Sequence, residues 1–87
     1  MISEGLSYAK LGKHKEAISF FDKVLKNYPD NIEALYQKGL VLVNLDKNKE
    51  ATLCFEKILE KNPEHTAALN NLGNIYSEMQ QFERATD

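Results

Sequence analysis

The side chains able to do acid–base, nucleophilic or metal chemistry are few in this chain and stand apart from one another. The two histidines, His14 and His65, lie in different halves of the sequence, and neither has a Cys or His at metal-ligand spacing. The single cysteine, Cys54, lacks the local base and orienting group that would activate a nucleophile. We therefore expect surface or helix-capping histidines and a partly buried, inert thiol, with no catalytic residue, no metal site and no cofactor.

The charged residues are mixed in sign and predict a solvated surface. The chain carries 11 Lys and Arg against 13 Asp and Glu, a formal net charge of −2. Nucleic-acid binders carry a basic surplus that neutralises phosphates, and anionic membranes attract one, so we expect neither partner. Pairs such as Asp22 with Lys26 are typical of a solvated helix face.

No stretch of the sequence predicts a membrane span or a secretion signal. The longest unbroken apolar run is Leu40 to Val43, far short of the ~20 residues that cross a bilayer. Lys10 interrupts the only candidate for a signal peptide. A lone cysteine cannot form an internal disulfide, which favours a cytoplasmic location.

The elements that position these residues follow a repeat of 34 residues. When the sequence is shifted by 34 places against itself, about 16 of the 53 overlapping pairs are identical, where chance gives roughly three or four. The aligned columns hold glycine, alanine, phenylalanine and proline, namely Gly5, Gly39 and Gly73, then Ala17, Ala51 and Ala85, then Phe21 and Phe55, then Pro29 and Pro63. The 87 residues therefore form about two and a half units, with boundaries 1–31, 32–65 and 66–87.

Each unit predicts two helices. Apolar residues recur at helical spacing in the segment 31–45, and they are so dense that this helix should be buried on more than one side. A second amphipathic helix includes Ala51 and ends before Pro63, which cannot continue the hydrogen-bond ladder. Asp30 predicts the N-cap of the helix that follows it. Because no alternating strand pattern is present, we predict an all-α fold.

The aligned small residues predict close contacts between the helices. Gly39 and Ala51 should let the two backbones of the second unit approach each other, because a helix-interior glycine otherwise costs about 1 kcal/mol against alanine. Phe55 is expected to fill space against the following unit. Lys38 is expected to lay its aliphatic stem along apolar surface with its ammonium in water.

The repeated columns resemble the tetratricopeptide repeat, whose pattern places Trp, Leu-Gly, Tyr, Ala, Phe and Pro at fixed positions over 34 residues. The resemblance covers essentially the whole chain and recurs in phase. The matching residues are Met1, Gly5, Tyr8, Ala17, Phe21 and Pro29, then Leu35, Gly39, Leu42, Ala51, Phe55 and Pro63, then Leu69, Leu72, Gly73, Tyr76 and Ala85. The sequence departs from the pattern in having no Trp and in placing Glu4 and Lys38 before the glycine. The pentatricopeptide repeat has a similar length, but its usual basic groove is missing.

The resemblance implies a right-handed superhelical stack of antiparallel helix pairs, whose first helices line a concave groove that binds a peptide or helix of a partner protein. Carried over to this sequence, the groove positions are Ile2, Leu6, Ala9, Tyr36, Gln37, Leu40, Val43, Asn44, Asn70, Asn71, Asn74 and Ser77. The apolar members suit an amphipathic helix, and the asparagines suit the backbone of an extended peptide because an amide donates and accepts. Leu40 and Val43 are open to a second interpretation, as core residues. The basic residues with which some members clamp a C-terminal carboxylate are missing.

The third unit predicts an alternative role in self-association. The sequence ends about one turn into the expected second helix of this unit, which should leave Leu72, Ile75 and Tyr76 partly uncovered. Solenoid arrays normally finish with a capping helix whose outer face is polar. Either the chain is a piece of a longer array, or a second copy covers this end by stacking or by helix exchange. The sequence therefore favours a protein-binding scaffold, with a homo-oligomerising structural segment as the alternative.

Overall fold

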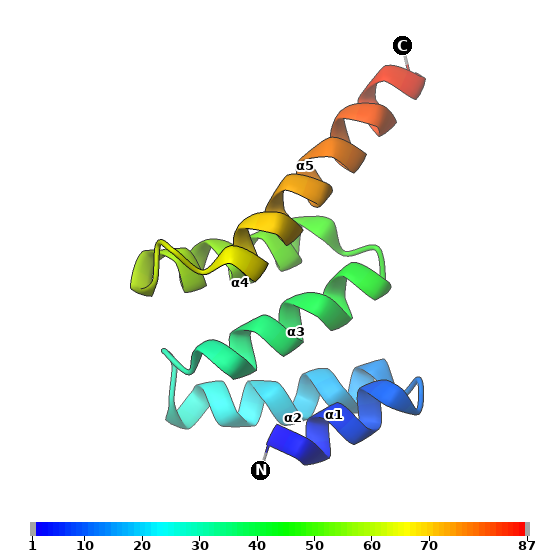
Figure 1. Cartoon of the computed structure of the whole chain (residues 1–87). Coiled ribbons are helices and arrows are strands. Elements are labelled where there is room, and N and C mark those ends of the chain that lie inside the picture. The colour runs from blue at the N-terminus through cyan, green and yellow to red at the C-terminus, as the bar shows by residue number, and fades with distance from the viewer. Residues whose placement is uncertain (1, 87) are drawn as a thin grey trace.

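Five helices form a stack of antiparallel hairpins. A computed structural model describes the backbone of residues 2–86 and the side chains of residues 5–80. The helices are α1 (Ile2–Lys10), α2 (His14–Asn27), α3 (Ile32–Asn44), α4 (Asn48–Lys61) and α5 (Thr66–Thr86). Each helix packs against the next along the chain, and α1 also reaches α3 (Figure 1). The predicted all-α repeat fold is confirmed. Within residues 2–86, none of the helices combines the length and apolarity that a bilayer span requires.

The turns inside the first two units are built alike. After α1 and α3, one residue adopts the left-handed region, Gly12 with φ of 78° and Asp46 with φ of 61°. The amide of the lysine that follows donates to the carbonyl five residues earlier, at 2.8 Å in the first unit and 2.9 Å in the second. This arrangement is a Schellman motif, which satisfies carbonyls at the helix C-terminus and stops the helix.

The third unit has no such turn in the part of the chain that the structure describes. The residue in phase with Gly12 and Asp46 is Gln80, and α5 continues through it as one helix of 21 residues. Glutamine lacks the tendency of glycine and aspartate to adopt a positive φ. Nothing in the local sequence therefore ends the helix, and the second helix expected in this unit is not formed.

Side-chain caps define the starts of α3 and α5. Asn31 Oδ1 accepts a hydrogen bond from the amide three residues on, at 2.9 Å. His65, which is in phase with Asn31, accepts in the same way through Nδ1, at 3.1 Å. The prediction that Asp30 caps α3 is wrong, because Asn31 is the extended residue directly before the helix. Asp30 instead lies 3.5 Å from Lys61, measured between Oδ2 and Nζ.

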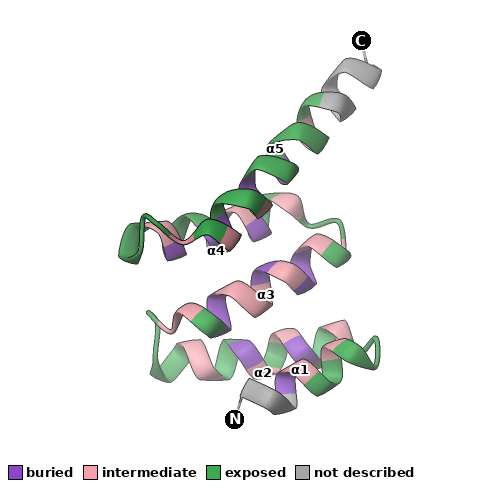
Figure 2. Cartoon of the chain, in the orientation of Figure 1, coloured by how far each residue is buried: buried purple, intermediate pink, exposed green. Residues whose placement is uncertain are grey.

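The middle helix, α3, has two buried faces. Leu35 and Leu42 pack with residues of α4 and α5, whereas Ala34 and Val41 pack with residues of α2. Figure 2 shows buried positions along α3, which lies between α1 and α2 on one side and α4 and α5 on the other. The prediction that this helix is buried on more than one side is therefore confirmed.

Phenylalanine rings lie directly on the glycines of the first two units. A Cβ placed on Gly39 would be 2.8 Å from Cζ of Phe55, and a Cβ on Gly5 would be 2.6 Å from Cε1 of Phe21. Both rings are fully buried. Phe55 thus fills the space over the glycine of its own unit. It also belongs to the core that includes Ala68, Leu72 and Ile75 of the following unit, as the sequence predicted. At the in-phase Gly73, the rest of the described residues place no atom within 4 Å of such a Cβ outside the adjacent backbone of α5.

An ion pair joins α2 to α3. Lys38 Nζ lies 2.6 Å from Asp22 Oδ1, and the two side chains are 25% and 51% exposed. Asp22 therefore pairs with the next helix and not with Lys26 on its own helix. The ammonium group of Lys38 therefore contacts this carboxylate. The sequence had predicted that the ammonium group lies in water.

Candidate peptide-binding face

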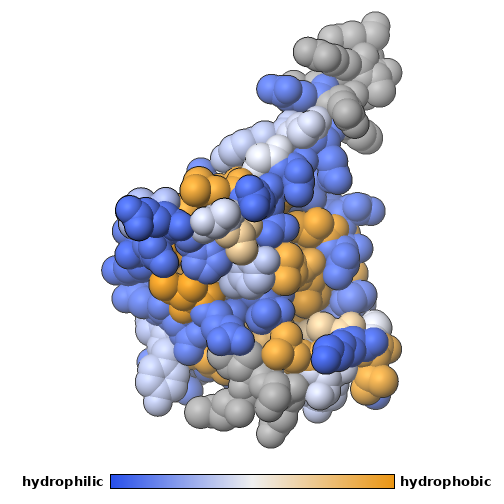
Figure 3. All heavy atoms as spheres, in the orientation of Figure 1, coloured by the Kyte–Doolittle hydropathy of each residue, from blue (hydrophilic) through white to orange (hydrophobic). Residues whose placement is uncertain are grey.

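Four of the five predicted groove residues of α3 are half-buried. Tyr36, Leu40 and Val43 pack against the core formed by α3, α4 and α5 and keep part of their surface exposed. Gln37 is also half-buried, and Asn44 is exposed. Leu40 and Val43 are therefore both packed against the core and accessible, so their two interpretations do not exclude each other. Figure 3 shows that apolar surface gathers in several patches over the stacked helices, separated by hydrophilic side chains.

Tyr36 is held from several directions. Its ring meets Phe55 edge-on at 5.9 Å between centroids and lies 5.6 Å from the ring of His65. Its hydroxyl oxygen accepts a hydrogen bond from Nδ2 of Asn71 at 3.3 Å. A half-buried tyrosine whose ring and hydroxyl are both held by neighbours is typical of an interface hot spot.

The polar neighbours of Tyr36 come from α5 and the residue before it. Asn71 Nδ2 donates to the carbonyl of Ala67 at 2.8 Å as well as to the Tyr36 hydroxyl. Because a backbone carbonyl can only accept, the atom that meets it must be the amide nitrogen. His65 accepts through Nδ1 as the cap of α5, so its neutral ring carries the proton on Nε2. The structure thus bears out the expected helix-capping role for His65.

The remaining predicted groove positions lie on α1 and α5. Leu6 and Ala9 on α1 are half-buried, and Ala9 packs against the core formed by α2 and α3. On α5, the exposed positions are Asn70, Asn74 and Ser77. The side chain of Ile2 lies outside the described residues. We call the groove residues of α1, α3 and α5 together the inner face.

The residues predicted for self-association divide into two groups. Leu72 and Ile75, expected to be partly uncovered, are only 6% and 2% exposed, because this side of α5 packs against α3 and α4. Tyr76 is 47% exposed, and Leu69 is 48% exposed. Leu69, Gly73 and Tyr76 are spaced four and three residues apart and so share one side of the helix. We call these three residues the α5 stripe.

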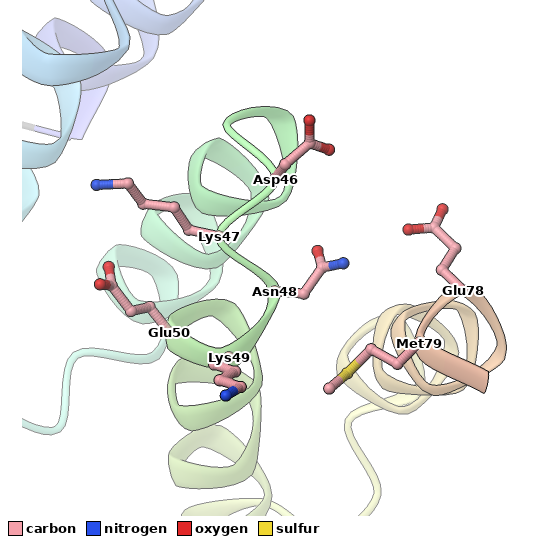
Figure 4. Close-up of a pocket in the computed structure, with 7 residues that line it drawn as sticks. All are labelled: Asp46, Lys47, Asn48, Lys49, Glu50, Glu78 and Met79. Carbon is pink, nitrogen blue, oxygen red and sulfur yellow. The ribbon is translucent and has the colours of Figure 1, made fainter. Parts of the chain in front are cut away.

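A hollow of about 800 Å³ lies apart from all these residues, between the start of α4 and the later part of α5. Its lining residues are Asp46, Lys47, Asn48, Lys49, Glu50, Glu78 and Met79, and Met79 points from α5 toward the start of α4 (Figure 4). Asn48 Oδ1 is buried and has no hydrogen-bond partner among the described residues. The sequence analysis missed this hollow because it depends on α5 continuing past α4. The one sequence signal for it was the absence of glycine or aspartate at position 80.

Cys54 is buried in the core between α3, α4 and α5, more deeply than the sequence predicted. Burial raises the pKa of its thiol above the ordinary value of 9.0, and the nearby ammonium group of Lys38 opposes this effect without reversing it. The thiol is therefore protonated at neutral pH, which does not favour nucleophilic chemistry.

These features define the chain as an α-helical repeat protein. The turn and the ring-on-glycine contact of the first unit recur in the second, and the cap of α3 recurs at α5, each after 34 residues. The family follows from the match of a family model, that of the Psidin N-terminal TPR repeats region, to residues 8–87. The chain belongs to the tetratricopeptide-repeat family, which confirms the resemblance seen in the sequence.

Solved structures of MamA, a TPR-containing protein, have a similar fold. A MamA RS-1 ArsTM double mutant has a TM-score of 0.85 and 26% identity over 95% of this chain. MamA from residue 41 onward, from Desulfovibrio magneticus RS-1, has a TM-score of 0.85 and 25% identity over 95%. Another MamA mutant has a TM-score of 0.79 and 27% identity over 93%. This chain spans about half the length of these structures, between 44% and 47% of each. No curated protein matches its sequence.

Proposed function

We propose that this chain is a non-catalytic, cytoplasmic scaffold that binds a peptide or helix of a partner protein on its inner face. Membership of the tetratricopeptide-repeat family and the likeness to MamA support a general role in protein interaction. The observation that carries the specific proposal is Tyr36, which contacts α4 and α5 through its ring and hydroxyl and remains half-exposed at the middle of the face. Leu40 and Val43 beside it add accessible apolar surface for a partner.

Binding of peptides selected from a display library tests this proposal. A Tyr36→Ala, Leu40→Ala double variant should weaken the selected peptides at least about 30-fold, since hot-spot residues contribute roughly 2 kcal/mol or more. The matched control is Leu53→Ala on α4, because Leu53 is a leucine with 67% exposure outside the inner face. Circular dichroism should show unchanged helicity in all variants. Loss of binding in the control variant alone would place the binding surface elsewhere.

A second candidate function is self-association through the α5 stripe. It is favoured by the exposure of Leu69 and Tyr76 and by the open space over Gly73 between them. If this function is correct, light scattering should show a mass that rises with concentration, and Tyr76→Glu should return the chain to a monomer. A chain that remains monomeric at high concentration would refute it. Leu53→Glu serves as the control for a charge placed on another exposed apolar position.

A further inference from the structure

The glycine column of the repeat is covered by an aromatic ring in two units and open in the third. Phe21 lies on Gly5 and Phe55 lies on Gly39, each ring coming from the second helix of the same unit. Over Gly73, the described residues beyond the adjacent backbone of α5 place no atom within 4 Å of an added Cβ. Among the described residues, the third unit therefore has the glycine on which a ring is seated but no ring.

The residues on either side of the glycine show the same difference between units. Leu35 and Leu42 flank Gly39 on α3 and are only 4% and 1% exposed, because α4 and α5 pack against them. Leu69 and Tyr76 are in phase with them on α5 and are 48% and 47% exposed. The α5 stripe is therefore the same kind of apolar surface as the covered side of α3, but it remains accessible.

We propose that the α5 stripe binds a helix of a partner protein that carries alanine and phenylalanine four residues apart, with the phenylalanine ring seated on Gly73. The helices that cover the other two glycines define this pattern. Both α2 and α4 place a fully buried alanine four residues before the fully buried phenylalanine, namely Ala17 and Phe21, and Ala51 and Phe55. Residues four apart share one side of a helix, so the small alanine lets the two backbones approach each other one turn away from the ring.

The spacing of the α5 stripe favours a helix over an extended peptide. Leu69 and Tyr76 lie about one turn on either side of Gly73, which leaves a gap between two larger side chains. Helices pack by placing side chains of one into such gaps of the other, and the contacts at Gly5 and Gly39 show that a phenylalanine ring fits. An extended peptide would leave backbone N–H and C=O groups against apolar side chains, whereas a helix satisfies these groups internally.

An intact second copy of this chain does not offer the required helix. Alanine followed four residues later by phenylalanine occurs twice in the sequence, at Ala17 and at Ala51. Both phenylalanines are fully buried over the glycines of their own units, so releasing either ring would open the core that it fills. The proposed occupant is therefore a different polypeptide. This inference goes beyond the proposed function, because no residue of the α5 stripe belongs to the inner face.

A peptide that copies α2, residues 14–27, tests this proposal on the full chain. A lactam between Asp22 and Lys26, which are exposed and one turn apart, holds the peptide helical. We expect fluorescence anisotropy to show that the labelled peptide binds. Phe21→Ala in the peptide should weaken binding at least about 30-fold, the effect of a hot-spot residue. Gly73→Leu in the chain should weaken the original peptide to a similar extent, because the new side chain fills the place of the ring.

Asn74→Leu is the matched control for Gly73→Leu. Asn74 is exposed at the adjacent position of α5, outside the α5 stripe, so the same new side chain there should leave the affinity unchanged. The Phe21→Ala peptide should lose less affinity for Gly73→Leu than for the original chain, since a smaller side chain in the peptide makes room for the larger one in the chain. Thermal unfolding should show that Gly73→Leu is at least as stable as the original chain, because leucine favours a helix more than glycine does.

Other results would overturn the proposal and identify what happens instead. Absence of binding at millimolar peptide would exclude this kind of partner. Binding that survives Gly73→Leu but is lost in the Tyr36→Ala, Leu40→Ala variant would place the peptide on the inner face and support only the proposed function. Binding that survives both changes would indicate exchange of the peptide with α2. If light scattering shows self-association that Gly73→Leu abolishes and the peptide does not compete with, the occupant of the α5 stripe is a second copy.

Discussion

The same substitution, glycine to alanine, should raise stability at one position of a repeat column and leave it unchanged or lower it at another. Gly73 and Gly39 are both inside helices, in α5 and α3, and alanine is favoured over glycine there by about 1 kcal/mol. A Cβ at Gly73 meets no atom within 4 Å in the described part of the chain beyond the adjacent backbone of its own helix, so Gly73→Ala should stabilise the chain by the whole of this amount. A Cβ at Gly39 meets the ring of Phe55 at 2.8 Å.

The magnitude at Gly39 follows from the room around Phe55. The ring must recede by about 0.6 Å to restore an ordinary contact of 3.4 Å. Phe55 is fully buried, with Tyr36 edge-on against it, so this movement disturbs a packed core. Overpacking of this kind costs about 1–3 kcal/mol, which equals or exceeds the gain from helix propensity and leaves a net loss of up to about 2 kcal/mol. The two variants should therefore differ by about 1–3 kcal/mol.

Thermal unfolding followed by circular dichroism measures this difference. In a domain of this size 1 kcal/mol corresponds to about 4–8 °C, so Gly73→Ala should raise the midpoint by that amount, while Gly39→Ala should leave it unchanged or lower it by up to about 16 °C. Combining Gly39→Ala with Phe55→Leu should show a favourable coupling, because the smaller side chain makes room for the new methyl group. Equal stabilisation by both alanine variants would refute the reasoning, since it would mean that the ring moves aside at no measurable cost.

Four further predictions concern a cap, a thiol and a turn. His65→Ala should lower the free energy of unfolding by about 1 kcal/mol in urea titrations, whereas His65→Asn, which copies the in-phase cap Asn31, should lower it little. Because burial raises the pKa of Cys54, alkylation at pH 7 should be slow and should follow the unfolded fraction as urea is added. The raised pKa also makes the free energy of unfolding depend on pH. Above pH 9.0 the unfolded chain releases the thiol proton before the folded chain does, so the free energy of unfolding in urea titrations should fall as the pH rises beyond 9.0. Cys54→Ala should abolish this fall. Asp46→Gly should stabilise the chain by about 0.5–1 kcal/mol in urea titrations, because glycine adopts the positive φ without strain, and Asp46→Val should destabilise it.

The repeat columns predicted the fold because each column reflects a local steric requirement. Gly5 and Gly39 leave room for a ring, and the positive φ at position 46 suits the aspartate found there. These requirements act between residues that are close in sequence or separated by a fixed offset. The same residue types therefore recur at the same positions of the first and second units, where a single sequence makes them visible. The prediction of a further helix start in the third unit was wrong for the same kind of reason, because Gln80 breaks the turn column.

The contacts between units were less predictable. Asp22 has a lysine one turn away on its own helix, and only the approach of α3 brings Lys38 to 2.6 Å. The hydrogen bonds of Asn71 depend on where α5 lies over α3, which the 34-residue period does not specify. Asn31 and Asp30 are adjacent and both good caps, so the start of α3 was placed one residue too early.

The division of buried residues on α3 has a consequence for how this chain unfolds. One side of α3 belongs to the core shared with α4 and α5, and the other belongs to the core shared with α2. In a one-dimensional nearest-neighbour description, the hairpin of α1 and α2 and the hairpin of α4 and α5 are coupled to each other chiefly through α3. Either hairpin can open while the other core stays intact, but α3 can be released only when both cores are lost. Native-state hydrogen exchange should therefore find the slowest amides in α3, at the free energy of global unfolding, and lower opening energies toward both ends of the stack.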